Sequence, residues 1–226
     1  MSWNDWVRGS AEIEPSLYAA DFAALGAEIE RVLDAGARIL HFDTGDGHFV
    51  EPVTIGPIVL RSIAPLVHER GGVLDCHLMV EDPEHHFEQF AEAGADSVTF
   101  HYEVAPDPPA TAEKARALGL RAGLAFNPAT APRDVAERAE GFDLVLCMSI
   151  WPGYSGQEFL PESPERVREL RSFLPPEIHV QVDGGIHGET IALARDAGAD
   201  LFVAGSAVFD GKDPAAAFRR LAEAVA

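Results

Sequence analysis

The stretch Ala35-Gly36-Ala37-Arg38-Ile39-Leu40-His41-Phe42-Asp43 decides the fold, because its pattern occurs three times along the chain. Ala93–His101 and Ala197–Gly205 repeat it, each with Ala-Gly-Ala, one further residue and then an apolar run. In each copy the Gly ends a helical segment, and a short run rich in β-forming residues follows. The repeat therefore predicts the helix-to-strand junctions of a parallel α/β fold.

We predict eight strands, one at each such apolar run: Ile13–Leu17, Ile39–Asp43, Val73–Val80, Ser97–Tyr102, Ala122–Asn127, Leu144–Ile150, Ile178–Asp183 and Leu201–Ala204. Helical patterns lie between them, among them Phe22–Ala35, Pro83–Ala93, Thr111–Leu118, Ser163–Phe173 and His187–Ala197. In the fourth of these, Ser163 is the expected N-cap and Pro164 suits the first helical position. Near-continuous apolar runs are typical of strands covered on both faces. Eight units in 226 residues match a single (β/α)8 TIM barrel better than an open sheet.

The chain shows no linker or shift in composition that would divide it. We expect a short N-terminal extension at residues 1–10 and one barrel domain at residues 11–226. The extension contains Trp3 and Trp6 and lacks a basic-then-apolar leader, so we expect no secretory signal. No Gly-x-Gly-x-x-Gly follows the first strand, which argues against a dinucleotide-binding domain.

Charge and cysteine content restrict the class of partner. The chain carries 17 Lys and Arg against 37 Asp and Glu, a formal net charge of −20. We interpret the negative charge as a solvated surface. The negative charge argues against nucleic acid as a partner and against a polybasic membrane anchor. No run approaches the roughly 18 apolar residues of a membrane span. Cys76 and Cys147 lie in apolar runs, so we expect buried free thiols and a reducing, cytoplasmic location.

The ends of the predicted strands carry a mostly polar set of residues. In a TIM barrel the active site lies at the C-terminal ends of the strands. Those ends hold Ser16, His41, Asp43, His77, His101, Asn127, Met148, Asp183, Gly205 and Ser206. His41 and Asp43 share one strand face, because side-chain direction repeats every two residues. With His77 and Asp183 they offer two imidazoles and two carboxylates, which suit Zn²⁺, Fe²⁺, Mn²⁺ or Co²⁺. The alternative is that these are ordinary polar residues of a barrel rim.

Glycines at the same end of the barrel predict a phosphate site. Asp183-Gly184-Gly185 closes the seventh strand and Gly205-Ser206 closes the eighth, where barrels often hold phosphate. Glycine lets the backbone approach an anion, and a helix N-terminus supplies N–H donors. Gly153-Tyr154-Ser155-Gly156 after the sixth strand is a candidate third part of the site. The alternative is that these are only turn glycines.

The chain resembles the ribulose-phosphate 3-epimerase family over nearly its whole length. The resemblance is carried by ordered motifs at compatible spacing: Pro15-Ser16, Ala20-Asp21-Phe22, His41-Phe42-Asp43, Asp46-Gly47-His48-Phe49-Val50, Thr54-Ile55-Gly56-Pro57, Asp75-Cys76-His77-Leu78-Met79-Val80, Asn127-Pro128-Ala129-Thr130, Met148-Ser149, Pro152-Gly153, Gly156-Gln157, Val182-Asp183-Gly184-Gly185-Ile186 and Ala204-Gly205-Ser206-Ala207-Val208-Phe209.

The resemblance implies an enzyme of carbohydrate metabolism in the pentose phosphate pathway. It implies an epimerase that inverts C3 of D-ribulose 5-phosphate to give D-xylulose 5-phosphate, with one divalent metal ion per chain and a metal-stabilised cis-enediolate. The metal ligands fall on His41, Asp43, His77 and Asp183. The acid/base pair falls on Asp43 and Asp183, one ionised and one protonated at the start. The substrate residues fall on Ser16, His77, Gly153, Tyr154, Ser155, Gly156, Asp183, Gly184, Gly185, Gly205 and Ser206. We also expect a homo-oligomer and no organic cofactor.

The chain departs from the family around this site. The family usually reads Asp-Val-Met-Asp-Gly where this chain has Asp43-Thr44-Gly45-Asp46-Gly47, and the Met is expected beside the reacting carbon. We expect the aromatic residues Tyr18 and Trp151 to refill the volume lost at Gly45. The alternative is a pocket for another ketose phosphate, a tetrulose or hexulose phosphate. Two further classes stay open: a phosphate-binding lyase or aldolase on a related barrel, and a protein that binds a sugar phosphate without turnover.

Overall fold

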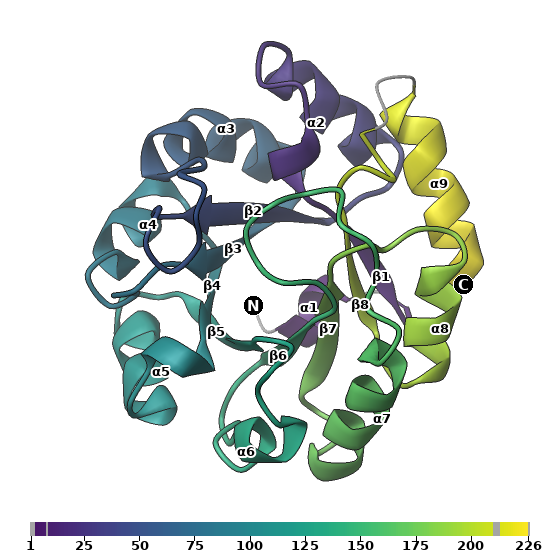
Figure 1. Cartoon of the computed structure of the whole chain (residues 1–226). Helices are drawn as coiled ribbons and strands as arrows, with labels where there is room; N and C mark the ends of the chain where they lie inside the picture. Colours follow the sequence, from purple (N-terminus) through teal and green to yellow (C-terminus); the bar gives the residue numbers. More distant parts are fainter. Residues whose placement is uncertain (1–2, 8, 210–212, 226) are drawn as a thin grey trace.

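The computed structural model describes residues 3–7, 9–209 and 213–225. Its centre is an eight-stranded parallel sheet in the order β1-β8-β7-β6-β5-β4-β3-β2. An isolated parallel bridge between Ser16 and His41 joins the first strand to the second and closes the ring (Figure 1). The strands are β1 (Glu12–Pro15), β2 (Ile39–Gly45), β3 (Val73–Met79), β4 (Ser97–His101), β5 (Arg121–Phe126), β6 (Leu144–Met148), β7 (His179–Asp183) and β8 (Leu201–Ala204). The predicted TIM barrel is confirmed.

Helices surround the ring of strands and bury their apolar faces against it (Figure 1). They are α2 (Leu25–Asp34), α3 (Pro57–Glu69), α4 (Phe87–Ala93), α5 (Pro108–Ala117), α6 (Pro132–Ala136), α7 (Ser163–Phe173), α8 (Thr190–Asp196) and α9 (Pro214–Val225). Two 3₁₀ turns, η1 (Leu17–Ala19) and η2 (Tyr102–Val104), follow β1 and β4. In the three sequence repeats, Gly36, Gly94 and Gly198 have φ values of 114°, 100° and 108°. Glycine adopts this left-handed conformation without strain, so each one ends a helix and turns the chain into the next strand.

The predicted N-cap at Ser163 is wrong. Helix α7 begins at Ser163, and Glu162 is its N-cap. The backbone carbonyl of Glu162 accepts hydrogen bonds from the amides of Glu165 and Arg166, which places the helix start one residue earlier than expected. Ser163 is buried, and its hydroxyl has no hydrogen-bond partner among the described residues.

A short helix, α1 (Trp3–Trp6), closes the N-terminal end of the barrel. Trp3 and Trp6 pack edge to face, with ring centroids 5.0 Å apart, and join a cluster inside the barrel that includes Ile39, Leu144 and Leu201. Figure 1 shows α1 behind the ring, on the barrel axis. Met1, Ser2 and Arg8 of the predicted extension lie outside the described residues. The division into an extension and a barrel domain stays a prediction.

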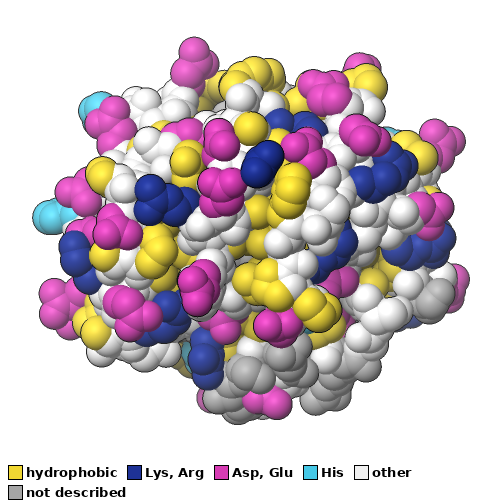
Figure 2. All heavy atoms as spheres, turned by 90° about the horizontal axis from the view of Figure 1, so that it is seen from below, with side chains coloured by type: hydrophobic (Ala, Val, Ile, Leu, Met, Phe, Trp, Pro, Cys, Tyr) yellow, Lys and Arg dark blue, Asp and Glu magenta, His cyan; other side chains and the backbone are white. Residues whose placement is uncertain are grey.

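The structure confirms the predicted state of the two cysteines. Cys76 and Cys147 are both buried free thiols. None of the helices that the structure describes is long and apolar enough to cross a membrane. On the face shown in Figure 2, acidic side chains are interspersed with basic ones rather than gathered in one patch, which fits a solvated surface.

Candidate functional site

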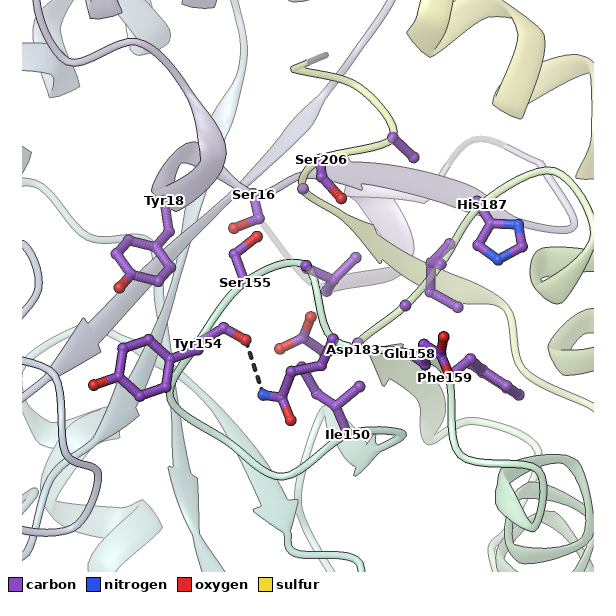
Figure 3. A pocket seen from close by; sticks show the side chains of 18 of the residues that line it. Ser16, Tyr18, Ile150, Tyr154, Ser155, Glu158, Phe159, Asp183, His187 and Ser206 are labelled. Atoms are coloured by element: carbon purple, nitrogen blue, oxygen red, sulfur yellow. Dashed lines mark hydrogen bonds between the residues drawn. The ribbon is translucent and has the colours of Figure 1, made fainter.

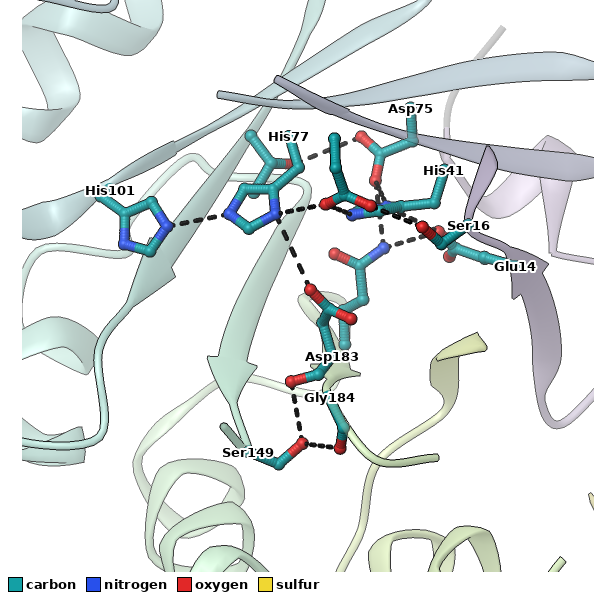
Figure 4. A network of polar contacts seen from close by, with 12 residues as sticks. Glu14, Ser16, His41, Asp75, His77, His101, Ser149, Asp183 and Gly184 are labelled. Atoms are coloured by element: carbon teal, nitrogen blue, oxygen red, sulfur yellow. Dashed lines mark hydrogen bonds and ion pairs between the residues drawn. The ribbon is translucent and has the colours of Figure 1, made fainter. Parts of the chain in front are cut away.

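Four of the predicted residues meet at the C-terminal end of the barrel. His41 comes from β2, His77 from β3 and Asp183 from the end of β7, and their side chains point towards one another (Figure 4). Asp43, two residues after His41 on β2, joins them. One ligand-type atom from each lies within 4.8 Å of the others. His77 Nδ1 is 3.0 Å from Asp43 Oδ1 and 3.8 Å from Asp183 Oδ2. Ser16, directly after β1, donates from its hydroxyl to Asp43 Oδ2 at 2.6 Å.

The surroundings of His41 fit a cation at this point. Its Nδ1 lies 3.1 Å from Asp75 Oδ2 and 3.6 Å from Glu14 Oε2, so this nitrogen carries the proton and donates it to carboxylates. Its Nε2 has no hydrogen-bond partner in the described part of the chain, yet it lies 3.2 Å from Asp43 Oδ1. A nitrogen lone pair facing a carboxylate oxygen is unfavourable unless a proton or a metal ion lies between them. Two imidazoles and two carboxylates are a donor set that divalent transition metals accept, so the residues present fit such an ion.

The two catalytic candidates have opposite electrostatic environments. Burial alone would raise the pKa of Asp43, but His41 and His77 outweigh it and hold that pKa well below the usual range. Burial, and then the charge of Asp43, raises the pKa of Asp183 to about 7. Asp43 is therefore ionised at neutral pH while Asp183 can hold a proton. A pair of carboxyl groups whose pKa values are pushed apart is typical of acid/base catalysis.

A second polar layer lies beneath the site, and the sequence analysis missed it. Glu14, Asp75 and Gln181 are fully buried in the barrel and linked to one another: the Gln181 amide donates to Glu14 Oε2 at 2.6 Å and to Asp75 Oδ2 at 3.1 Å. Burial raises the pKa of Glu14 to about 7. Each stands two positions before a predicted site residue, Ser16, His77 or Asp183. The alternation of side chains along a strand was therefore the signal that could have found them.

His101 was among the predicted strand-end residues, without a role. It is fully buried, and its Nε2 lies 2.8 Å from His77 Nε2 (Figure 4). Its Nδ1 lies 3.3 Å from Glu103 Oε2. Burial lowers the pKa of His101 to about 4, so its imidazole is neutral. Burial would raise the pKa of Glu103, but hydrogen bonds from His101, Thr130 and the Asn127 amide outweigh it and lower that pKa to about 2. Asn127, another strand-end candidate, contributes here through its backbone.

A cavity of about 590 Å³ opens above these residues (Figure 3). Most of the predicted substrate residues line it, namely Ser16, Gly153, Tyr154, Ser155, Gly156, Asp183, Gly184, Gly185, Gly205 and Ser206, and so does the catalytic candidate Asp43. His77, which was also predicted to contact substrate, is not among the lining residues, because it is fully buried beside Asp43. Tyr18, Met79 and Met148 also line the cavity.

At its glycine-rich end the cavity offers backbone groups to a ligand, although the acidic side chains of Glu158 and Glu189 also line it. Gly184 and Gly185 have φ values of 117° and 63°. A Cβ at Gly185 would lie 2.5 Å from the Phe159 backbone nitrogen, so only glycine fits there. Among the described residues that line the cavity there is no Lys and no Arg. An anion held here would rely on backbone N–H groups, as a glycine-rich turn allows.

The space beside Gly45 is filled, but not by the residues that we expected. A Cβ at Gly45 would lie 2.8 Å from the Pro52 carbonyl oxygen and 2.8 Å from Val50 Cγ2. These two residues come from the segment that follows β2. Trp151 is 55% exposed and does not line the cavity, so the prediction that it fills this volume is wrong. Tyr18 does line the cavity, yet it is not among the three nearest contacts of the added atom.

Comparison with solved structures supports the fold. A crystal structure of KGPDC from Streptococcus mutans aligns with a TM-score of 0.71 at 15% identity, covering 96% of this chain and 98% of the other. Orotidine 5′-phosphate decarboxylase from Pyrococcus horikoshii aligns with a TM-score of 0.68 at 19% identity, covering 94% and 98%. At such low identity these similarities show the shared barrel and no more.

Comparison with known sequences gives the family. The profile described as the Ribulose-phosphate 3 epimerase family matches residues 12–209. A ribulose-phosphate 3-epimerase from Candida glabrata is 43% identical over 215 residues, covering 89% of this chain and 87% of its own length. One from Mycobacterium bovis is 43% identical over 216 residues, covering 94% and 92%. With its barrel, its His and Asp cluster and these similarities, the chain belongs to the ribulose-phosphate 3-epimerase family.

Proposed function

We propose that this enzyme interconverts D-ribulose 5-phosphate and D-xylulose 5-phosphate by moving protons at C3 between two carboxyl groups, with one divalent metal ion per chain. The observation that carries the proposal is the pair Asp43 and Asp183: one ionised, one with a pKa near neutrality, and both in the wall of the same cavity. Epimerase activity on a pentose phosphate follows from family membership. The metal, the residue roles and the substrate are the proposal.

Inversion of a carbon next to a ketone requires a proton to leave one face and another to arrive on the opposite face. Asp43 and Asp183 come from strands β2 and β7, on different sides of the barrel mouth (Figure 1). In one direction Asp43 accepts the C3 proton, and Asp183 delivers its proton to the other face; in the reverse direction the roles exchange. The electron pair released at C3 is delocalised towards the C2 oxygen, which gives a cis-enediolate.

The metal ligands that we propose are His41, Asp43, His77 and Asp183. A divalent ion bound by them supplies Lewis-acid stabilisation of negative charge on the substrate oxygens, usually worth several kcal/mol. Ser16 fixes Asp43 Oδ2 with its hydroxyl, so that the carboxylate keeps one orientation while it exchanges protons. We propose that His41 binds the metal through Nε2, because its Nδ1 already donates a hydrogen bond to Asp75.

We propose that the substrate phosphate lies at the glycine-lined end of the cavity, against Gly184, Gly185, Gly205 and Ser206, with Gly153, Tyr154, Ser155 and Gly156 across from them. Binding energy from a phosphate held there orients the reacting carbon between the two carboxyl groups. The filled space at Gly45 supports a five-carbon substrate over a bulkier one. A homo-oligomer and a cytoplasmic location remain our predictions; a rice relative, 40% identical over 220 residues, is named as a cytoplasmic isoform.

A substrate panel on metal-loaded protein tests the function. Ketose phosphates of four, five and six carbons are compared by kcat/KM, in D₂O as well as in H₂O. We expect the highest kcat/KM with D-ribulose 5-phosphate, and incorporation of solvent deuterium at C3 with inversion. A higher kcat/KM with a tetrulose or hexulose phosphate would reassign the substrate. Carbon–carbon cleavage would indicate a lyase or aldolase, and binding without turnover would contradict the proposed chemistry.

A further inference from the structure

Two side chains support His77 from the side that faces away from the cavity. Its Nδ1 faces Asp43 and Asp183, whereas its Nε2 lies 2.8 Å from Nε2 of His101. The two imidazole rings are inclined by only 24°, which suits an in-plane hydrogen bond between the two nitrogens. His101 in turn has its Nδ1 3.3 Å from Glu103 Oε2. The three side chains form a continuous line from η2 to the candidate metal ligands; Figure 4 shows its His101–His77 part.

The hydrogen-bonding capacity of each group determines where the protons lie. An ionised carboxylate only accepts hydrogen bonds, so the contact with Glu103 requires a proton on His101 Nδ1. A neutral imidazole has a single N–H, which leaves His101 Nε2 as an acceptor. The contact between the two Nε2 atoms then requires His77 to carry its proton on Nε2. The remaining nitrogen of His77, Nδ1, is then left with its lone pair 3.0 Å from Asp43 Oδ1, an arrangement that a cation between the two atoms makes favourable.

We propose that Glu103 is a positioning residue which acts through His101 to hold His77 in the tautomer whose lone pair lies on Nδ1, directed at the metal position between Asp43 and Asp183. The inference rests on the proposed function, in which His77 is a metal ligand. Partners that fix the tautomer of a ligating histidine typically change metal affinity by about 10- to 100-fold when they are lost. Glu103 reaches the ligand through one intervening ring and touches neither the metal position nor the cavity wall.

The loop around Glu103 makes one isosteric substitution especially informative. Glu103 Oε1 accepts a hydrogen bond from the Asn127 amide at 2.8 Å and another from the Thr130 hydroxyl. In Glu103→Gln these two donors hold the amide oxygen on their side, which places the NH₂ group against His101. The NH₂ group donates to His101 Nδ1, the proton of His101 moves to Nε2, and His77 Nε2 must become the acceptor. His77 then carries its proton on Nδ1, where the metal should bind.

Zinc affinity of the full-length chain tests this reversal. Competition with a chromophoric chelator gives the dissociation constant of Zn²⁺ for the wild type, for Glu103→Gln and for the control Glu84→Gln. Glu84 also accepts from a threonine hydroxyl, Thr111 Oγ1 at 2.7 Å, and pairs with Lys114, but it does not line the cavity. We expect 10- to 100-fold weaker binding for Glu103→Gln and wild-type binding for Glu84→Gln. Equal affinity of Glu103→Gln and the wild type overturns the proposal, as does an equal loss in both variants.

A spectroscopic measurement tests the proposal on the wild-type protein as well as on the variant. Long-range ¹H–¹⁵N correlation spectra of histidine-labelled wild-type protein report which ring nitrogen carries the proton. We expect the proton on Nε2 of His77 and on Nδ1 of His101, and the opposite pattern on both rings in Glu103→Gln. A proton on Nδ1 of neutral His77 in the wild type overturns the inference even if zinc binds normally. Wild-type protein that binds no zinc overturns the proposed metal instead, so the two failures are distinguishable.

Discussion

Gly45→Ala should destabilise the protein although it adds only one methyl group. The added carbon would lie 2.8 Å from the Pro52 carbonyl oxygen and 2.8 Å from Val50 Cγ2, and 3.3 Å from Thr54 Cγ2. The Pro52 oxygen belongs to the backbone, so the contact cannot be relieved by a change of rotamer. Overpacking of this kind typically costs about 1–3 kcal/mol, and replacing a strand glycine by alanine returns about 0.5–1 kcal/mol. The central values of these two ranges leave a net loss of about 1 kcal/mol.

Thermal unfolding measures this loss. For a chain of this size 1 kcal/mol shifts Tm by roughly 2–4 °C, so Tm should fall by roughly that amount. Gly26→Ala is the matched control: the same change in helix α2 meets only Leu66 Cδ2 at 3.9 Å, and it should leave Tm unchanged or raise it. A Gly45→Ala variant as stable as Gly26→Ala would refute the assignment of Val50 and Pro52 as the residues that fill this space.

The same substitution should reach the cavity. Pro52 and Val50 also lie 3.4 Å and 3.5 Å from a Cβ built at Gly153, a residue of the cavity wall. A displacement of this segment at Gly45 therefore alters its contact with the wall at Gly153. We therefore expect kcat/KM to fall for five-carbon and six-carbon ketose phosphates alike, and Gly45→Met to lose more activity than Gly45→Ala. A gain in six-carbon turnover in either variant would contradict this.

Asp43→Asn and Asp183→Asn should each lower the epimerisation rate by roughly two to four orders of magnitude, the usual scale of lost acid/base catalysis; metal content is measured alongside, and near-wild-type turnover in either variant would remove that residue from the mechanism. Exhaustive chelation should abolish activity, and titration with Zn²⁺, Fe²⁺, Mn²⁺ or Co²⁺ should restore it at one ion per chain; full turnover in metal-free protein would exclude the metal. Gly205→Val should raise KM for the phosphorylated substrate, because even a Cβ there lies 3.2 Å from Ala19 Cβ and 3.5 Å from Ser155 Oγ; an unchanged KM would place the phosphate elsewhere. The pKa of Glu103 is about 2 in the folded protein against an ordinary 4.5, so its ionised form stabilises the fold above pH 4.5, and this stabilisation is lost as the pH falls towards 2. The difference in urea midpoint between wild type and Glu103→Gln should therefore become smaller between pH 4.5 and pH 2. A difference that stays constant over this range would contradict the lowered pKa.

The sequence predicts those parts of the structure that depend on local pattern. The Ala-Gly-Ala repeats mark three helix-to-strand junctions because left-handed backbone favours glycine, and the two-residue period of a strand places His41 and Asp43 on one face. The same two-residue period, counted back from His77, would also have identified Asp75 on the same face of its strand. Residue types at strand ends were therefore enough to find the candidate metal ligands, whereas the acid/base roles came from the resemblance to the family.

Features that depend on the path of a loop were not predictable in this way. Val50 and Pro52 reach Gly45 because the chain folds back through a bridge between Asp46 and Val53 and through the Thr54 hydroxyl, which accepts from the Gly45 amide at 2.7 Å. Aromatic size alone suggested Trp151 instead, and nothing in the sequence shows that this side chain is directed to solvent. The direction of the His101 imidazole likewise depends on Glu103.

The closure of the barrel runs through the candidate active site. Every other neighbouring pair of strands is joined by a continuous ladder, whereas β1 and β2 meet through the single bridge between Ser16 and His41. The hydroxyl of Ser16 adds one side-chain link across this seam, to Asp43. Amide hydrogen exchange should therefore be fastest along this seam, and a ligand that bridges Asp43 to β7 or β8 should slow it. We therefore expect the barrel to open most readily between β1 and β2, at the candidate active site, and bound substrate to stabilise it there.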